Sequence, residues 1–150
     1  MKVIVDTNVV VVANGRDTPH ASFACRLACV QSLDDIQRQH VIVLDDGWRV
    51  INEYKKKVNQ SGQPGVGDRF LRWVLRNVSN REHCETIKIT SLPDSMDGND
   101  FAEFPHEPQL AQFDRSDRKF VAIALAHPER PPILNATDTD WRSYQATLEK

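Results

Sequence analysis

Apolar residues recur along this chain at two different spacings, and each spacing predicts one kind of secondary structure. Short runs rich in β-branched residues, bounded by polar residues or turn signals, predict buried strands. These runs lie at residues 3–5, 41–44, 85–90 and 133–134. Apolar residues spaced three and four positions apart predict helices. They occur near residues 18–33, 48–58, 70–78 and 117–127.

Strands and helices alternate in this pattern, which predicts an α/β fold with a mostly parallel central sheet. A parallel sheet is normally covered by helices on both faces, so we expect a three-layer α/β/α sandwich. The chain has 150 residues, enough for one hydrophobic core, and we expect a single domain over residues 1–150. The stretch 91–117 contains three prolines and little periodicity, and it predicts a long irregular loop.

Carboxylates stand near the ends of several predicted elements. Asp6 follows the first predicted strand, and Asp138 and Asp140 follow the last one. Glu53 lies beside the apolar stripe of the second predicted helix, and Asp117 is in the first turn of the last helix. Open α/β sheets bind ligands where the carboxyl ends of their strands open into loops. These acids therefore converge on one site if the first and last strands are neighbours in the sheet.

Each acid also has a simpler explanation. The helix dipole stabilises a carboxylate in the first turn, so Asp114 and Asp117 are suited to capping the last helix. Glu53 fits a solvated helix surface, and Asp6 and Asp138 fit turns that follow strands. The functional interpretation rests on the grouping of the acids rather than on any one of them.

The order and spacing of four features resemble the PIN-domain family of nucleases. They are VDTNVV near the start, a helical glutamate, DRKFVAIALA, and a terminal strand followed by TDTDW. Together they span nearly the whole chain, although an Asp-Thr-Asn triplet by itself occurs in many proteins. The resemblance implies a PIN-like fold in which acids bind one or two divalent metal ions.

The resemblance also implies which residues are catalytic and bind metal. Four acids match the positions that the family uses, and a fifth matches a less regular position as a metal ligand: Asp6, Glu53, Asp117, Asp138 and, fifth, Asp140. For the helical glutamate, Asp45 and Asp46 are neighbouring alternatives, and both are also suited to capping that helix.

Such a cluster needs a cation, because two carboxylates about 5 Å apart repel by roughly 3 kcal/mol at an effective dielectric near 20. Oxygen ligands suit Mg²⁺ or Mn²⁺. We expect Asp6, Asp117 and Asp138 to bind the ion, and Glu53 to hold a second ion or a coordinated water. The resemblance thus predicts an endoribonuclease that hydrolyses single-stranded RNA with a metal-activated water, leaving a 3′-hydroxyl and a 5′-phosphate.

The overall charge of −2 does not indicate a nucleic-acid partner, but its distribution is informative. Residues 49–81 hold eight basic and two acidic side chains, a net charge of +6 that suits a phosphate path. An ordinary solvated helix face is the alternative. Residues 91–117 carry a net charge of −6, which fits a gate over the metal site, a surface for a basic partner, or a merely solvated acidic loop.

We expect a cytoplasmic protein with no membrane partner, because the sequence contains neither an export signal nor a membrane-spanning segment. Its three cysteines cannot all pair with one another, and Cys25 and Cys29 lie one helical turn apart in an apolar pattern. We expect reduced core thiols, since a zinc site lacks a second pair of Cys or His ligands at the usual spacing.

Two other functions are compatible with the pattern. Phosphatases of the haloacid-dehalogenase type also carry an aspartate after the first strand. They usually need a second aspartate two residues later, where this chain has Asn8. A catalytically inactive PIN-like module that binds RNA or protein would keep the fold without the chemistry.

The biological role follows only from the resemblance. Many small, single-domain PIN proteins are ribonuclease toxins that an antitoxin holds inactive, and others act in defence or RNA processing. The resemblance therefore implies an RNA substrate, an antitoxin or other regulatory protein as partner, and a homodimer. The five histidines are scattered and do not separate these roles.

Overall fold

A parallel sheet brings the first and last strands of this protein together. The computed structural model describes residues 1–15, 22–58, 65–93 and 98–136. Within these ranges the sheet has the order β3-β2-β1-β4. Its strands are β1 Lys2–Val5, β2 Val41–Asp45, β3 Cys84–Ile87 and β4 Ile133–Leu134. Every pair is parallel, so the predicted α/β fold with a parallel sheet is confirmed.

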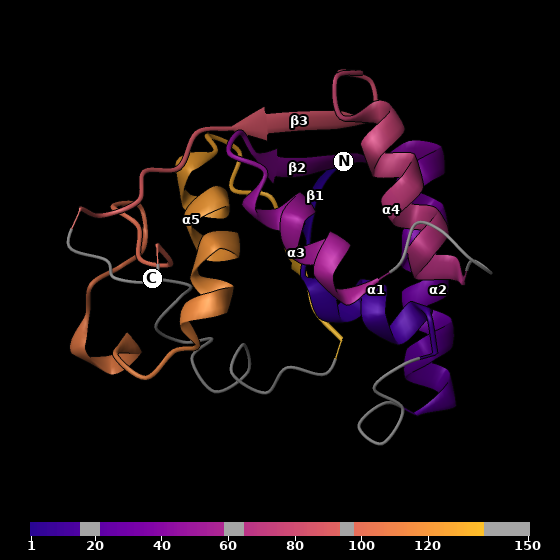
Figure 1. Ribbon diagram of the computed structural model, residues 1–150, viewed down its shortest axis with the longest axis horizontal. Coiled ribbons are helices and arrows are strands. Elements are labelled where there is room, and N and C mark those ends of the chain that lie inside the picture. The colour runs from indigo at the N-terminus through magenta and orange to yellow at the C-terminus, as the bar shows by residue number, and fades with distance from the viewer. Residues whose placement is uncertain (16–21, 59–64, 94–97, 137–150) are drawn as a thin grey trace.

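Five α-helices connect these strands in the described part of the chain (Figure 1). They are α1 Thr7–Ala13, α2 Phe23–Gln39, α3 Arg49–Lys57, α4 Val66–Asn77 and α5 Arg118–Ala126. Two short 3₁₀ turns, η2 Pro108–Leu110 and η3 Arg115–Asp117, precede α5. The helices α1, α2 and α4 contact one another, whereas α5 contacts β1, β2 and β4 and stands apart from that group in Figure 1. None of the described helices is both long and apolar enough to cross a membrane.

The helix α1 has no counterpart in the sequence predictions, because its residues TNVVVVA have the β-branched composition of a strand. Tertiary contacts override that preference. Asp6 caps the helix, and three of its valines are buried where α1 contacts α2, α3 and α4. Asn14 fixes α1 to α4, since its Nδ2 donates to Asp68 Oδ1 at 2.8 Å and its Oδ1 accepts from the Asp68 backbone N–H at 3.0 Å.

The helix predicted near residues 18–33 is α2, but its ends differ from the prediction. It begins at Phe23, where the Ser22 hydroxyl oxygen accepts from the Cys25 backbone N–H at 3.0 Å, and it continues to Gln39. Residues 16–21, where the helix was expected to start, lie outside the described residues. The other three predicted helices correspond to α3, α4 and α5.

The three cysteines are free thiols, as expected. Cys29 and Cys84 are buried, and Cys25 is half-buried at the edge of the core. Burial, together with the neighbouring Cys25 thiol, raises the pKa of Cys29 to about 12. Burial raises the pKa of Cys84 to about 11. Both buried thiols therefore stay protonated at neutral pH and behave as small apolar residues.

The segment before α5 is irregular, as predicted, but it is not merely a solvated acidic loop. Phe101, Phe104, Leu110 and Phe113 are all buried in the core. The composition of this segment suggested solvation because it contains many acids and prolines besides these four apolar residues. The described part of the loop, residues 98–117, is therefore packed against the rest of the protein.

Arg118 at the start of α5 holds this loop in place. Its Nη1 donates to Asp100 Oδ1 at 3.1 Å, and its Nη2 donates to the Ala111 carbonyl at 3.3 Å. The guanidinium also lies over the Phe104 ring, 4.8 Å from the centroid. Burial tends to raise the pKa of Asp100, but the hydrogen bonds of Arg118 and His106 outweigh it and hold this pKa below its ordinary value.

Candidate active site

Asp6 lies at the carboxyl end of β1, beside the carboxyl end of β4. The residue is almost fully buried, and its Oδ1 accepts from the Asn8 backbone N–H at 3.0 Å. Asn8 in turn reaches the segment after β4. Its Nδ2 donates to Asn135 Oδ1 at 2.6 Å, and its Oδ1 accepts from the Ala136 backbone N–H at 3.0 Å. The chain after the last strand is thus tied to the residues that follow the first.

Glu53 on α3 is held from two sides. The Thr7 hydroxyl donates to Glu53 Oε2, and Lys119 Nζ donates to Glu53 Oε1 at 2.9 Å. Lys119 also donates to the Ser116 carbonyl. The side chain of Lys119 is only 5% exposed and that of Glu53 is 20% exposed, so this ion pair is largely removed from water. Glu53 thereby links the start of α1 with the start of α5.

Asp117 ends η3 and directly precedes α5, and it is buried. Its side chain makes no capping hydrogen bond to α5. Asp114 is the residue that caps, because its Oδ1 accepts from the Ser116 backbone N–H at 2.9 Å and from the Ser116 hydroxyl at 2.8 Å. The capping hydrogen bond therefore belongs to Asp114, at the start of η3, and not to Asp117.

Asp45, one alternative to Glu53, has a structural role at the start of α3. It is completely buried, its Oδ2 accepts from the Arg49 backbone N–H at 2.9 Å, and its Oδ1 accepts from the Val50 backbone N–H at 2.9 Å. Asp46, the other alternative, is exposed. Of the three acids, Glu53 is the one that contacts the segments carrying the other candidate acids.

The buried Tyr54 indicates how the acids lie around the end of β1. Its hydroxyl donates to the Val5 carbonyl at 2.5 Å, which fixes α3 to this end of the strand. Burial raises the pKa of Tyr54 well above its ordinary value, and the negative charges of Asp6, Glu53 and Asp45 raise it further. Asp6 and Glu53 therefore act electrostatically on one buried phenol, although they are far apart in sequence.

The described acids have the chemistry of a magnesium site without a complete ligand set. Asp6, Glu53 and Asp117 offer carboxylate oxygens, which suit Mg²⁺ or Mn²⁺. Among the described residues, no group of three acidic, His or Cys side chains is arranged to hold a metal ion. Both oxygens of Glu53 accept hydrogen bonds from other side chains. The other two predicted ligands, Asp138 and Asp140, lie outside the described residues.

A cavity of about 320 Å³ opens beside Glu53. It is formed by one face of α3, by the loop before η2 and by the η3–α5 junction. Its lining is rich in basic and amide side chains: Arg49, Asn52, Glu53, Lys56, Lys57, Asn99, Ser116 and Lys119. The cavity therefore combines one candidate acid with four cations.

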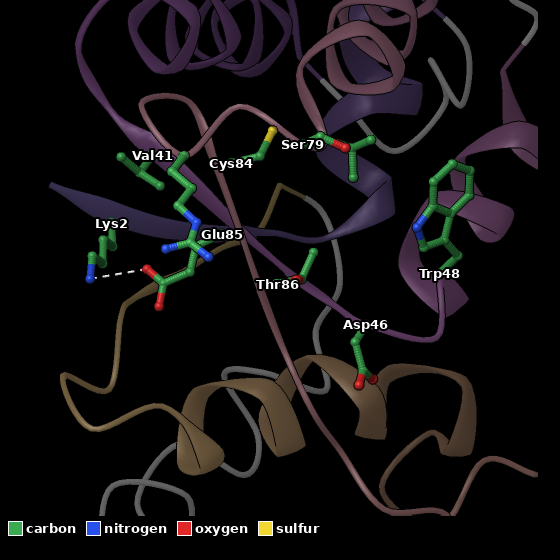
Figure 2. Close-up of a pocket in the computed structure, with 10 residues that line it drawn as sticks. Lys2, Val41, Asp46, Trp48, Ser79, Cys84, Glu85 and Thr86 are labelled. Atoms are coloured by element: carbon green, nitrogen blue, oxygen red, sulfur yellow. Dashed lines mark ion pairs between the residues drawn. The ribbon is translucent and has the colours of Figure 1, made fainter.

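A larger cavity of about 690 Å³ lies along the edge strand β3, and of the candidate site residues only the alternative Asp46 lines it (Figure 2). Figure 2 shows the ion pair between Lys2 and Glu85, at 3.0 Å, on one side of it. Asp46 and Trp48, at the turn before α3, line another part. Two basic and two acidic side chains line this cavity, so it lacks the excess of basic side chains found in the cavity beside Glu53.

Comparisons of the chain with protein-family models, with curated protein sequences and with solved structures found no match. The interpretation of function therefore depends on the geometry described above and on the sequence motifs.

Three residues that shape this site are absent from the sequence prediction: Thr7, Tyr54 and Lys119. Thr7 follows Asp6 directly and Lys119 follows Asp117 by two positions, so adjacency to a predicted acid was a usable signal for both. Tyr54 belongs to the apolar stripe of its helix. Its bond to Val5 depends on how α3 packs against β1, which helical spacing does not reveal.

Proposed function

We propose that this protein is a divalent-metal-dependent endoribonuclease with a PIN-like active site that hydrolyses single-stranded RNA. The observation that carries the proposal is the position of Glu53, which contacts Thr7, next to Asp6, and Lys119, two residues after Asp117. The segments that carry Asp6, Glu53 and Asp117 thus meet near the carboxyl edge of a parallel sheet, where α/β enzymes bind ligands.

In this proposal Asp6, Asp117 and Asp138 would bind Mg²⁺ or Mn²⁺, with Asp140 as a fifth, less regular ligand. One or two such ions, when bound, supply a Lewis acid for the phosphodiester and lower the pKa of water. Asp6 and Asp117 are both buried. Glu53 would hold a second ion or a coordinated water. Hydrolysis leaves a 3′-hydroxyl and a 5′-phosphate.

The pairing of β1 with β4 supports the contribution of the last acids. Asn135 and Ala136 are hydrogen-bonded to Asn8, so the chain leaves the sheet next to Asp6. Asp138 follows Ala136 by two positions. This short distance along the chain supports a site shared by the carboxyl ends of β1 and β4.

We also propose that the fold is a three-layer α/β/α sandwich of the PIN type. Adjacent residues of a strand point to opposite faces of a sheet, so Cys84 and Glu85 of β3 face opposite sides. His127, directly after α5, bonds to Glu85 at 2.9 Å. The contacts of α5 with β1, β2 and β4, and those of α2 with β2, support a helical layer on each face.

A catalytically inactive PIN-like module that binds RNA or protein is the second candidate. One observation favours it. The ammonium of Lys119 already neutralises Glu53, an acid that the nuclease needs at its metal site. If a divalent ion does not displace this lysine, the acidic edge has only a structural role.

For the biological role, we propose a cytoplasmic toxin or defence ribonuclease controlled by an antitoxin or another regulatory protein, acting as a homodimer. The resemblance to small PIN toxins supports this role. Growth arrest on induction of the wild-type chain, and its loss with Asp117→Asn, is the expected result. Normal growth with an enzyme that is active in vitro would contradict the toxin role alone.

The nuclease is tested by incubating labelled single-stranded RNA and single-stranded DNA with the protein in Mg²⁺, Mn²⁺ or chelator. We expect metal-dependent cutting of RNA by the wild type and none by Asp117→Asn or Asp6→Asn. Asp114→Asn is the matched control, because Asp114 belongs to the same segment but only caps η3. Its cleavage should stay near the wild-type rate.

The melting profiles of all variants separate lost chemistry from lost folding. Undiminished cleavage by both Asp6→Asn and Asp117→Asn would refute the nuclease proposal. RNA binding without cleavage in any metal would favour the inactive module.

A further inference from the structure

The cavity beside Glu53 follows a single face of α3. Five residues of this helix line it: Arg49, Asn52, Glu53, Lys56 and Lys57. They are three, four, seven and eight positions from the first, a spacing that places them on one side of a helix. Ile51 and Tyr54 lie on the buried side. We call Arg49, Asn52, Lys56 and Lys57 the α3 basic face.

The α3 basic face keeps its positive charge because the acid within it is already paired. Glu53 is neutralised by Lys119, which comes from α5. Arg49 is itself paired with the buried Asp45, so the charges of Lys56 and Lys57 contribute most to the potential of the cavity. Lys56 and Lys57 are exposed at its rim. Cations that line a concave surface beside an acidic site attract a polyanion toward that site.

Arg49 has a defined position at the start of this face. Its guanidinium Nη1 forms an ion pair with Asp45 Oδ2 at 3.5 Å, and its Cζ lies over the Phe101 ring, 5.4 Å from the centroid. The side chain is still 34% exposed. A guanidinium held in one orientation is a suitable donor for a phosphate group, because its planar fork matches two phosphate oxygens.

The lining of this cavity distinguishes these residues from the rest of the basic segment at residues 49–81. Lys55 does not line the cavity, and its Nζ lies over the Trp48 ring, 5.4 Å from the centroid. Arg69, Arg72 and Arg76 of α4 do not line it either. The predicted phosphate path is thereby narrowed to one face of one helix.

We propose that the α3 basic face binds the phosphate backbone of single-stranded nucleic acid and directs it to Glu53. This inference rests on the proposed function, which supplies the reason for a strand to approach the acids. From Arg49 to Lys56 the helix is about 10 Å long, at roughly 1.5 Å per residue. That length spans about three phosphates at roughly 3.4 Å per nucleotide of a stacked strand. The amides of Asn52 and Asn99 offer hydrogen bonds to sugar or base in the same cavity.

Fluorescence anisotropy with a short labelled single-stranded RNA tests the proposal in EDTA, where cleavage cannot interfere. Each phosphate contact to a single strand contributes about 0.7 to the slope of log K against log salt. We therefore expect Lys56→Gln/Lys57→Gln to lower the slope by about 1.4 and to weaken binding roughly 10- to 30-fold at about 0.1 M salt. Lys55→Gln removes one charge from the same helix outside the cavity, and it should change affinity by about two-fold at most.

Unchanged affinity in the double variant, or an equal loss in Lys55→Gln, would overturn the proposal. A poly-glutamate peptide that competes as well as RNA would also overturn it, because the face would then be a docking surface for an acidic protein. Parallel cleavage assays in Mg²⁺ separate the two inferences. RNA binding that depends on Lys56 and Lys57 without any cleavage supports the α3 basic face and removes the nuclease. If the double variant cleaves RNA and binds it as tightly as the wild type, the nuclease is supported and the role of the α3 basic face is refuted.

Discussion

Lys119 and Glu53 form an ion pair between α5 and α3, with 2.9 Å between Nζ and Oε1. The lysine follows Asp117 by two positions, and the other oxygen of Glu53 accepts from Thr7, next to Asp6. The pair therefore joins the segments that carry the candidate ligands. In the proposed nuclease this lysine is a built-in cation that competes with a divalent ion for the same carboxylate.

Replacing Lys119 by methionine keeps much of the apolar stem and removes the charge. In chelator, we expect the free energy of unfolding to fall by roughly 1.5–3 kcal/mol, because Glu53 loses a charged hydrogen-bond partner in a largely buried position. We also expect Mn²⁺ to bind about ten-fold more tightly, since no ammonium has to be displaced. Urea denaturation and Mn²⁺ titration followed by melting temperature measure the two effects.

Lys119→Arg is the control for this variant, since it keeps the positive charge and should bind Mn²⁺ much as the wild type does. Equal or weaker Mn²⁺ affinity in Lys119→Met would show that the lysine and the metal ion do not compete.

Tyr54→Phe removes the hydroxyl that donates to the Val5 carbonyl at 2.5 Å. We expect a loss of roughly 1–3 kcal/mol of unfolding free energy at neutral pH, because a buried acceptor loses its donor. The pKa of Tyr54 is higher in the folded protein than in the unfolded chain, where it is about 10. The stability linked to the neutral phenol is therefore fully present below about pH 10 and declines as the pH rises above that value. The difference in unfolding free energy between wild type and variant should therefore become smaller above that pH, as measured by urea titrations. A gap that stays constant to high pH would contradict the assignment.

Asp100→Asn weakens the contact that holds the loop before α5. Because Arg118 and His106 lower the pKa of Asp100 in the folded state, its ionised form stabilises the fold above the unfolded pKa of about 3.9. That contribution is lost as the pH falls through the folded pKa. We expect the variant to be roughly 1–2 kcal/mol less stable at pH 7 and to converge with the wild type in acid.

Glu107→Gln changes an exposed acid of the same loop and is the matched control for Asp100→Asn, with a negligible expected effect. A stability difference for Asp100→Asn that does not depend on pH would argue against the ion pair with Arg118.

Gly67→Ala tests the contact between α1 and α4. A Cβ added at Gly67 would collide with the Val10 carbonyl oxygen of α1. In an exposed helix the same change would stabilise by about 1 kcal/mol through helix propensity, so the sign of the effect is diagnostic. We expect a net destabilisation of roughly 1–3 kcal/mol in thermal or urea unfolding. A more stable variant would mean that α1 and α4 separate easily.

The sequence predicted the parallel sheet and most helices because buried strands and amphipathic helices differ in the period of their apolar residues. It could not predict α1, whose valines favour a strand until Asp6 caps them and the neighbouring helices bury them. It also misjudged the acidic loop. Phe101 and Phe113 are far apart in that loop, and only the tertiary structure shows that both enter the core.

For the site, strand ends and helix starts predicted the general position of Asp6 and Asp117. The sequence could not separate Glu53 from Asp45, because both lie near the same helix. The structure separates them by the partners of each carboxylate: backbone N–H groups for Asp45, and Thr7 and Lys119 for Glu53. Such partners come from elements distant in sequence, so they have no signature in local spacing.

The pairing of β1 with β4 has a consequence for synthesis of the chain. Asn8 and Asn135 are 127 positions apart, yet their side chains are hydrogen-bonded. A ribosome therefore makes almost the whole described chain before Asp6 gains its neighbouring strand. Until then β1 lacks the strand that pairs with it on the side opposite β2.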